Sequence, residues 1–219
     1  FTGNIIGPSY EGENFSAKAV DEALLLRSNF ISNYASDIDD VVFLRGQFEE
    51  LLDKARQLHI SPNPKELVEW MYSRGLDSIL SSYGISSNLL TTAAKNGALA
   101  LSRASVSIQE ALVNKNGHYK YISSLKRLAY NEDRSVLVVS AGLAKDRPLE
   151  AQSDELWWGG GFSNLDEPYG TIIRFIRGFD PEGKGLASGK FGITLDSGEE
   201  GVFAALFSSD GRLLETIQG

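Results

Sequence analysis

The spacing of apolar residues changes once along this chain, and that change restricts the fold more than any single motif does. In the first part, apolar side chains recur at helical spacing, as in Val41, Leu44, Phe48 and Leu51, which indicates helices with one buried face. From residue 135, short β-branched runs replace that spacing, as is typical of buried strands. Helices first and strands last predict an α+β fold rather than a repeated βαβ fold.

Four helices are predicted, over 16–34, 37–58, 63–83 and 87–114. Gly75 is an expected interruption of the third helix. The second helix has an acidic and basic face that includes Glu49, Glu50 and Lys54 opposite its apolar stripe. The apolar face of the fourth consists mainly of small residues, so we expect this helix at the centre of the helical part. A membrane-inserting hairpin is the weaker alternative, because charged residues such as Arg103 interrupt that face.

Strands are predicted over 135–141, 171–177, 190–195, 201–207 and 212–217. The last three are separated by short polar turns, and Asp210-Gly211 is a strong hairpin signal. Strands joined by tight turns pair antiparallel, so we expect the chain to end in an antiparallel meander. The segment 118–133 fits either a short helix or a strand.

These elements predict an α+β fold in which an N-terminal bundle of about four helices packs on a C-terminal, mainly antiparallel β-sheet. Residues 1–219 are expected to form a single domain, because the sheet has an apolar face and the helices have apolar stripes that can cover it. The alternative is a division near residue 130 into a helical unit, 1–130, and a β unit, 131–219.

Composition argues against several classes of function. The chain is 42% hydrophobic and 23% charged, which is ordinary for a globular protein. It contains no cysteine, which excludes disulfides, thiolate zinc sites and cysteine nucleophiles. The formal net charge is −8 without a Lys/Arg cluster, so neither nucleic acid nor an anionic membrane surface is an expected partner. No apolar run reaches the roughly 20 residues of a membrane span.

The chain starts at Phe1-Thr2-Gly3-Asn4, without an initiator methionine, a basic region or an apolar leader. This start predicts either the removal of a leader or a beginning inside a longer chain. We therefore expect a soluble protein, with export after processing as one explanation of the start.

Several stretches are close to cofactor- or metal-binding motifs, but their residue spacing does not match those motifs. The glycine-rich stretch 183–190 is close to a phosphate-binding loop, but Phe191 stands where a Ser or Thr must contact magnesium. The acids Asp180 and Glu182 lack the ligand series of a calcium-binding hand. Two histidines without cysteine give no conventional zinc spacing. No cofactor and no metal are therefore expected.

His118 is the best catalytic candidate, since it lies at a helix exit beside other polar groups. Its acidic partner would come from residues 154–180, with Asp154 and Glu155 as candidates, in a hydrolase-type enzyme whose residues converge from distant segments. A lone histidine is not a catalytic constellation, so a structural role for His118 is the competing interpretation.

The stretch Trp157-Trp158-Gly159-Gly160-Gly161-Phe162 is the predicted contact region for a partner or ligand. On a strand, one indole would point into the core and the other outward beside the glycine run. An outward indole can anchor a protein partner. The candidate binding residues are Trp157, Trp158, Gly160 and Phe162. Burial of both indoles is the competing interpretation.

Three functions follow from these features. A non-enzymatic protein-interaction or structural domain, exported or part of a larger assembly, fits best because the sequence offers no catalytic constellation. The hydrolase with His118 is the first alternative. The second is a carbohydrate- or small-ligand-binding module that stacks its ligand on tryptophan.

Overall fold

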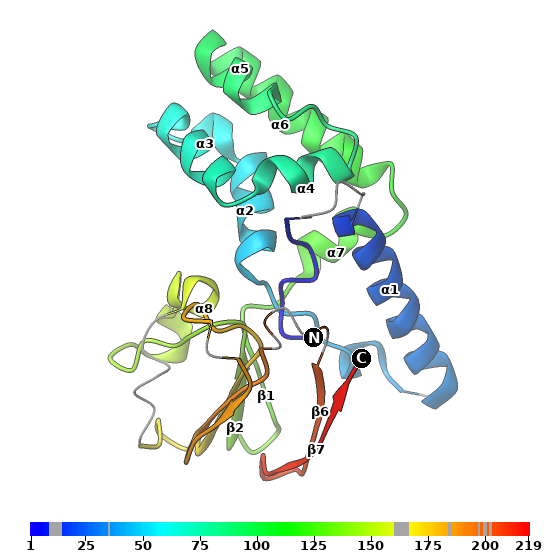
Figure 1. The fold of residues 1–219 in the computed structure, drawn as a ribbon, viewed down its shortest axis with the longest axis vertical. Helices are drawn as coiled ribbons and strands as arrows, with labels where there is room; N and C mark the ends of the chain where they lie inside the picture. The colour runs from blue at the N-terminus through cyan, green and yellow to red at the C-terminus, as the bar shows by residue number, and fades with distance from the viewer. Residues whose placement is uncertain are drawn as a thin grey trace. The chain divides into compact units, whose positions relative to one another are not determined.

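A computed structural model describes residues 1–8, 15–34, 36–159, 167–183, 185–196, 198, 201 and 203–219. The chain divides into two compact units. The sheet unit comprises Phe1–Gly3, Val42–Gln47 and Lys126–Gly219, and the helical unit comprises Asn4–Val41 and Phe48–Leu125. The predicted α+β fold class is confirmed, with helices in the first part and strands in the last (Figure 1). The single domain and the division near residue 130 both stay predictions.

The helical unit is built from short amphipathic helices around an aliphatic core. Its helices are α1 (Phe15–Tyr34), α2 (Gln47–Arg56), α3 (Pro64–Ser73), α4 (Leu76–Ser82), α5 (Leu89–Asn96), α6 (Ala98–Val113) and α7 (His118–Ser124), with the 3-10 turns η1 (Ile38–Asp40) and η2 (Leu58–Ile60). Residues with no exposed surface include Leu51 and Leu52 of α2, Ile79 and Leu80 of α4, and Ile108 of α6. Each helix therefore contributes one apolar face to a shared interior.

Glycines split two of the predicted helices. Gly75, with φ +87°, separates α3 from α4 as expected, and Gly97, with φ +89°, separates α5 from α6. Residues with a side chain rarely adopt this φ, so each glycine ends one helix and starts the next. The expectation of one central helix over 87–114 is wrong, because α6 buries one face and leaves Leu99 and Val106 exposed.

The second helix begins later than predicted. Asp37 caps only the turn η1, where its own N–H bonds the carboxylate of Asp40 at 2.7 Å. The following run, Val42-Phe43-Leu44, is extended: Lys126 donates its N–H to the Phe43 carbonyl, and Arg45 donates to the Lys126 carbonyl. β-Branched and aromatic residues favour this extended backbone, and α2 starts only after it.

The sheet unit contains a mixed five-stranded sheet in the order β1-β2-β3-β5-β4 and a separate hairpin of β6 and β7. The bounds are β1 (Ala129–Tyr130), β2 (Val136–Val139), β3 (Arg174–Arg177), β4 (Ala187–Ser188), β5 (Gly192–Thr194), β6 (Phe203–Phe207) and β7 (Leu213–Gln218). The central strands β2, β3 and β5 run parallel, and β1 and β4 flank them antiparallel.

The predicted meander of the last three strands is wrong. β5 pairs in parallel with β3, with Ile176 opposite Ile193, whereas β6 and β7 form the antiparallel hairpin expected at Asp210-Gly211. Parallel neighbours need a long crossover, which the segments 140–173 and 178–191 supply. The sequence argument assumed that strands close in sequence also pair with each other.

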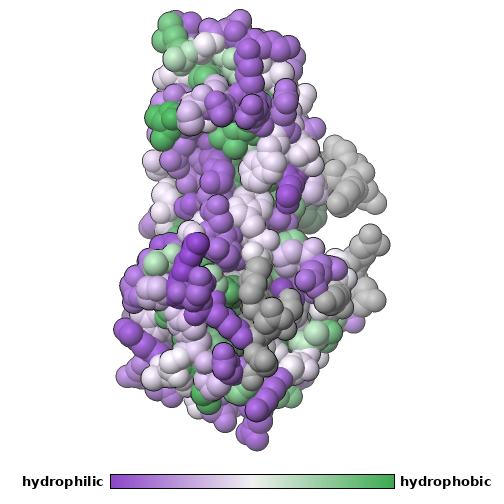
Figure 2. Space-filling model, turned by 90° about the vertical axis from the view of Figure 1, so that its left-hand side faces the viewer, coloured by the Kyte–Doolittle hydropathy of each residue, from purple (hydrophilic) through white to green (hydrophobic). Residues whose placement is uncertain are grey.

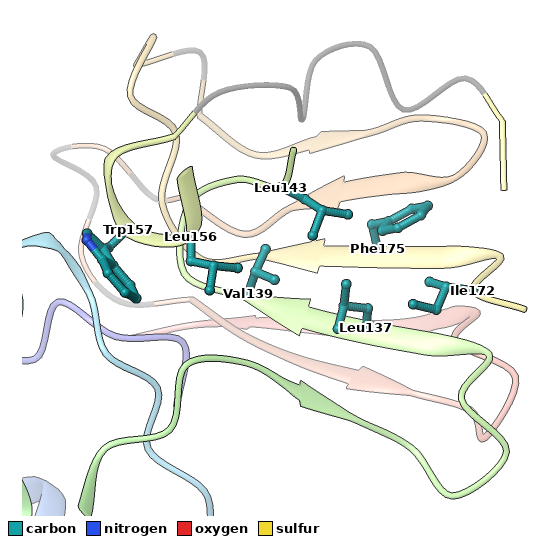
Figure 3. Close-up of a cluster of buried hydrophobic side chains, with 7 residues drawn as sticks. All are labelled: Leu137, Val139, Leu143, Leu156, Trp157, Ile172 and Phe175. Atoms are coloured by element: carbon teal, nitrogen blue, oxygen red, sulfur yellow. The ribbon is translucent and has the colours of Figure 1, made fainter. Parts of the chain in front are cut away.

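One face of the five-stranded sheet is covered by the crossover from β2 to β3 (Figure 3). This crossover contains the 3-10 turn η3 (Leu149–Ala151) and the one-turn helix α8 (Glu155–Trp158). The strands and the crossover share one buried cluster: Leu137, Val139, Leu143, Leu156, Trp157, Ile172 and Phe175. The sheet unit thus covers this face with its own chain, a role that the sequence argument gave to the N-terminal helices.

The turn of the β6–β7 hairpin lies against the opposite face. Leu137 and Phe175 point into the cluster, so their neighbours Val136 and Arg174 point the other way. Gly211 has φ +75°, and a Cβ built on it would lie 2.7 Å from side-chain carbons of Val136 and Arg174. Only glycine fits this turn, because both the backbone conformation and the close approach exclude a side chain.

A buried arginine joins the carboxyl ends of the three parallel strands. Arg177, at the end of β3, donates from Nε to Thr194 Oγ1 at 2.8 Å and from Nη1 to the Ala141 carbonyl at 3.4 Å. Its Nη2 lies 2.9 Å from Asp180 Oδ1, and both side chains are buried. Burial lowers the pKa of Arg177, and neighbouring carboxylates, Asp180 foremost, oppose that shift. The guanidinium therefore fixes how the strands end relative to one another.

We expect Asp180→Ala to destabilise the protein by about 3–5 kcal/mol, because it leaves the buried guanidinium of Arg177 without its carboxylate. The measurement is urea unfolding followed by circular dichroism. Asp154→Ala is the matched control, since Asp154 is exposed and its loss should change the unfolding midpoint little. Equal midpoints for the two variants would show that the Arg177–Asp180 pair does not hold the strand ends.

Candidate functional site

His118, the predicted catalytic candidate, is fully buried at the start of α7. Its Nε2 lies 2.9 Å from Asp21 Oδ1 of α1, and its Nδ1 lies 3.0 Å from the hydroxyl of Tyr83, which ends α4. The rings of Tyr83 and His118 meet edge to face, with centroids 5.6 Å apart. One imidazole therefore connects three helices of the helical unit.

Asp21 determines which ring nitrogen of His118 must donate a hydrogen bond. A carboxylate only accepts hydrogen bonds, so Nε2 carries the hydrogen and donates it to Asp21. In the neutral imidazole, Nδ1 is then the acceptor, and the hydroxyl of Tyr83 donates to it. Hydroxyl, imidazole and carboxylate follow one another in the order found in catalytic triads. In this chain, however, the hydroxyl at the end of the series belongs to a side chain that is only 8% exposed.

A second buried polar group lies in the same unit. Glu49 of α2 has no exposed surface, and it accepts hydrogen bonds from the backbone N–H groups of Asn4 at 2.9 Å, Ile5 at 2.8 Å and Ile6 at 3.2 Å. The hydroxyl of Tyr121 in α7 adds a fourth at 3.1 Å. Three successive N–H groups that converge on one carboxylate form an anion-binding nest, here filled by the protein's own side chain.

The sequence argument placed Glu49 and Glu50 on a polar helix face, and this is wrong, because both are buried. Glu49 is buried because the segment Asn4–Ile6, called the arm below, covers it with its backbone N–H groups. Glu50 instead bonds Lys54 of the next helical turn at 3.1 Å. Spacing along α2 contains no signal for the arm, which lies more than forty residues away in sequence.

The buried groups shift each other's ionisation. Burial raises the pKa of Tyr83, and the carboxylates of Asp21 and Glu49 raise it further. Burial also raises the pKa of Tyr121, with Glu49 as the next cause. Burial raises the pKa of Glu49 as well, while the bonds from the arm and from Tyr121 act against that rise. Both phenols therefore stay protonated and act as hydrogen-bond donors.

Together these hydrogen bonds form one buried polar cluster, called the clamp below. Tyr83, His118, Tyr121 and Glu49 are all buried, and each has a hydrogen-bond partner inside the helical unit. A buried polar group costs free energy unless it is paired, and these pairs connect the arm, α1, α2, α4 and α7. We interpret this polar cluster as the element that fixes the helices, with Asp21 as its exposed end.

The predicted acidic partners of His118 lie in the other unit. Asp154 and Glu155 start α8, where Glu155 Oε1 lies 3.5 Å from Arg147 Nη1. The carboxylate that the structure places beside His118 is Asp21, which the sequence argument did not select. A catalytic role for His118, Asp154 or Glu155 stays a prediction.

The Trp157–Phe162 region was expected as a strand with one indole on each side. Trp157 and Trp158 instead belong to the one-turn helix α8. Trp157 is 7% exposed within the sheet cluster, and Trp158 is partly buried against the same cluster. Gly160 and Phe162 lie outside the described residues. The region as a binding site stays a prediction.

A candidate contact surface comes instead from α1. The first half of this helix buries Ser16, Ala17, Val20 and Ala23, whereas none of residues 24–34, called the distal half below, is buried. This half exposes large apolar side chains: Leu25, Leu26, Phe30 and Tyr34. The rings of Phe30 and Tyr34 contact each other at 5.0 Å between centroids. In Figure 1, the helix runs out beyond α4 and α7 of its own unit.

The described parts of the chain contain neither a metal-binding cluster nor a membrane-spanning helix. No group of three or more histidine and acidic side chains there could hold a metal ion. Within the same ranges, every helix is too short or too polar to cross a bilayer.

Comparison with known protein families, curated proteins and solved structures gives no match to this chain.

We expect the buried phenols to destabilise the protein in alkali. A raised pKa means that folded Tyr121 keeps its proton where the unfolded chain releases it, near the ordinary value of 10.0. This contribution to stability is complete below pH 10 and is lost as the pH rises above it. Tyr121→Phe should therefore flatten the fall of the unfolding free energy above pH 10.

Tyr119→Phe is the control for this titration, because Tyr119 lies on the same helix and is exposed. Its substitution should leave the alkaline slope as it is in the unmodified protein. The same slope in both variants would contradict the buried, protonated state of Tyr121.

Proposed function

We propose that this chain is a protein-interaction domain and that the distal half of α1 is its contact surface. The observation that supports this most directly is the exposure of Leu26 at 57%, Phe30 at 42% and Tyr34 at 71% on one helix. Apolar and aromatic side chains grouped on an exposed helix are typical of sites that another protein covers.

The polar interior supports a non-enzymatic role. Within the clamp, the series Asp21, His118 and Tyr83 ends in a buried hydroxyl, and Glu49 is enclosed by the arm and Tyr121. These groups stabilise the helices through one another, which accounts for them without a substrate. The hydrolase and the carbohydrate-binding module stay alternatives, and the triad order of Tyr83, His118 and Asp21 is the observation that favours the first.

The distribution of apolar surface also supports a local contact site. The side of the molecule seen in Figure 2 is mainly hydrophilic, with apolar residues scattered between polar ones. Single exposed apolar residues are ordinary on protein surfaces, whereas a cluster calls for an explanation. The same proposal includes a protein as the partner of α1. It also includes export of this chain, with the partner bound after export. Trp157 and Trp158 contribute to the core of the sheet unit in this account.

We expect Leu26→Glu and Phe30→Glu to leave the folded protein stable while they abolish partner binding. An exposed position tolerates a charge at a cost of roughly 0.5 kcal/mol or less, whereas Leu101→Glu in the core of α6 should unfold the protein. Thermal unfolding measures the first effect. A photo-crosslinking amino acid at Tyr34, with mass spectrometry and rebinding of the purified partner, measures the second.

Leu99→Glu is the matched binding control, because Leu99 is an exposed leucine on a different helix. Partner binding should survive this change. If Leu26→Glu destabilises the protein as much as Leu101→Glu does, the face is covered within the folded chain and the proposal fails.

A further inference from the structure

The turn between α6 and α7 contains an asparagine followed by a glycine. His118 donates its N–H to the Lys115 carbonyl at 3.2 Å, and Asn116 and Gly117 are the two residues between them. Gly117 has φ +82° and ψ −15°, the values that a type II turn requires at its third residue. Asn116 and Gly117 are both exposed, so water reaches the pair.

This pair carries the groups of a self-contained reaction. When the backbone nitrogen of Gly117 attacks Cγ of Asn116, a bond forms between these two atoms and the bond from Cγ to the amide nitrogen breaks. The amide nitrogen leaves as ammonia and takes the proton of the Gly117 N–H. Water then opens the resulting five-membered imide at one of its two carbonyl carbons. One opening gives aspartate, and the other gives isoaspartate, in which the main chain runs through the side-chain carbons.

The reacting groups of the pair are not engaged elsewhere. Within the described ranges of the chain, neither the amide of Asn116 nor the N–H of Gly117 has a hydrogen-bond partner. Glycine also has no side chain that would obstruct its own nitrogen. Before the nitrogen can face Cγ, the hydrogen bond across the turn has to open, and local opening of an exposed turn costs far less than global unfolding.

A second Asn-Gly pair provides an internal comparison. Asn96 and Gly97 are also exposed, but Asn96 is the last residue of α5, and α6 begins at Ala98. Ring closure at Asn96 requires helical backbone to unwind, whereas ring closure at Asn116 requires only a turn to open. The structure therefore favours reaction at Asn116.

A change at Asn116 acts on the clamp because the histidine of the clamp lies two residues further along the chain. The ring of His118 is held between Asp21 and Tyr83. A Cβ built on Gly117 would lie 2.9 Å from Leu24 Cδ1, so α1 packs closely against this turn. Isoaspartate lengthens the turn by one main-chain carbon, which displaces His118 relative to its two partners.

We propose that Asn116 is a site of spontaneous deamidation and that isoaspartate at this position loosens the clamp between α1 and α7. Water is the only co-reactant. The reaction should be faster at higher pH, because the deprotonated backbone nitrogen is the attacking form. This modification is independent of the contact surface proposed on α1.

Incubation of the folded, unmodified chain in heavy-oxygen water at mildly alkaline pH tests the site, since each new carboxyl group takes up the heavy isotope. Cleavage after lysine and arginine in ordinary water then separates the peptides 116–120 and 96–103 for mass spectrometry. We expect the isotope to accumulate several-fold faster in 116–120. In urea the two rates should converge, because α5 no longer protects Asn96.

Three outcomes of the labelling experiment would overturn the site. One is a folded chain in which peptide 116–120 takes up no isotope. Another is an equal rate for both peptides in the folded chain. The third is a difference that persists unchanged in urea, which would show that the neighbouring sequence rather than the fold selects Asn116.

Thermal unfolding after the same incubation tests the effect on the clamp. The incubated, unmodified chain should unfold at a lower temperature than the fresh chain. Asn116→Gln is the matched control, because its longer amide would have to close a six-membered ring and reacts more slowly, so incubation should not change its midpoint. Fresh Asn116→Asp, which adds the charge without the extra main-chain carbon, should also keep its midpoint.

Equal midpoints for the fresh and incubated unmodified chains would show that isoaspartate does not loosen the clamp. An equal loss in incubated Asn116→Gln would place the damage elsewhere in the chain. An equal loss in fresh Asn116→Asp would assign the effect to the charge and contradict the lengthened turn as its cause.

Discussion

The buried carboxylate of Glu49 is the interaction on which the helical unit depends most. It receives three backbone N–H groups from the arm and one hydroxyl from α7. The arm leads into α1, so one side chain of α2 connects the first and last helices of the unit. Ile6 of the arm is itself fully buried, which means that the polar contact and the apolar packing hold the same segment. Loss of the polar contact would leave a buried carboxylate with fewer partners, which is unfavourable.

The polar side chains in the interior of the helical unit are paired with one another, so the proposed contact site lies on the surface. His118 has both ring nitrogens engaged, and the two phenols keep their protons because burial raises each pKa. Through these hydrogen bonds, His118 and the two tyrosines connect α1, α2, α4 and α7. The sheet unit follows the same logic, since Arg177 fixes the strand ends and Trp157 fills the core. Exposed apolar side chains remain on α1, on α6 and on the β6–β7 hairpin, and those on the distal half of α1 are the ones proposed as a contact surface.

Local signals in the sequence predicted much of the fold. The helix break at Gly75 and the hairpin at Asp210-Gly211 each depend on a few neighbouring residues, and the change of apolar spacing gave the α+β class. The direction of β5 could not be predicted, because a parallel pairing with β3 depends on a crossover rather than on a turn. The extended run Val42-Phe43-Leu44 was missed for a similar reason, since its partner Lys126 is distant in sequence.

The site was harder to predict than the fold. The sequence singled out His118, but its partners lie 97 and 35 residues away, at Asp21 and Tyr83. Glu49 shares its helical spacing with polar surface residues, so only the three-dimensional position of the arm reveals its burial. The indoles of α8 were assigned by strand alternation, which does not apply to a helical turn. Contacts between residues distant in sequence therefore determine the surroundings of His118 and Glu49.

Amide hydrogen exchange at Asn4, Ile5 and Ile6 tests the central claim most directly. If Glu49 holds the arm, these three amides exchange as slowly as the core of α2 in the unmodified protein and quickly in Glu49→Gln. Glu50→Gln, which alters the neighbouring buried acid and its bond to Lys54, should keep the arm protected. Rapid exchange in the unmodified protein, or equal protection in Glu49→Gln, would contradict the account.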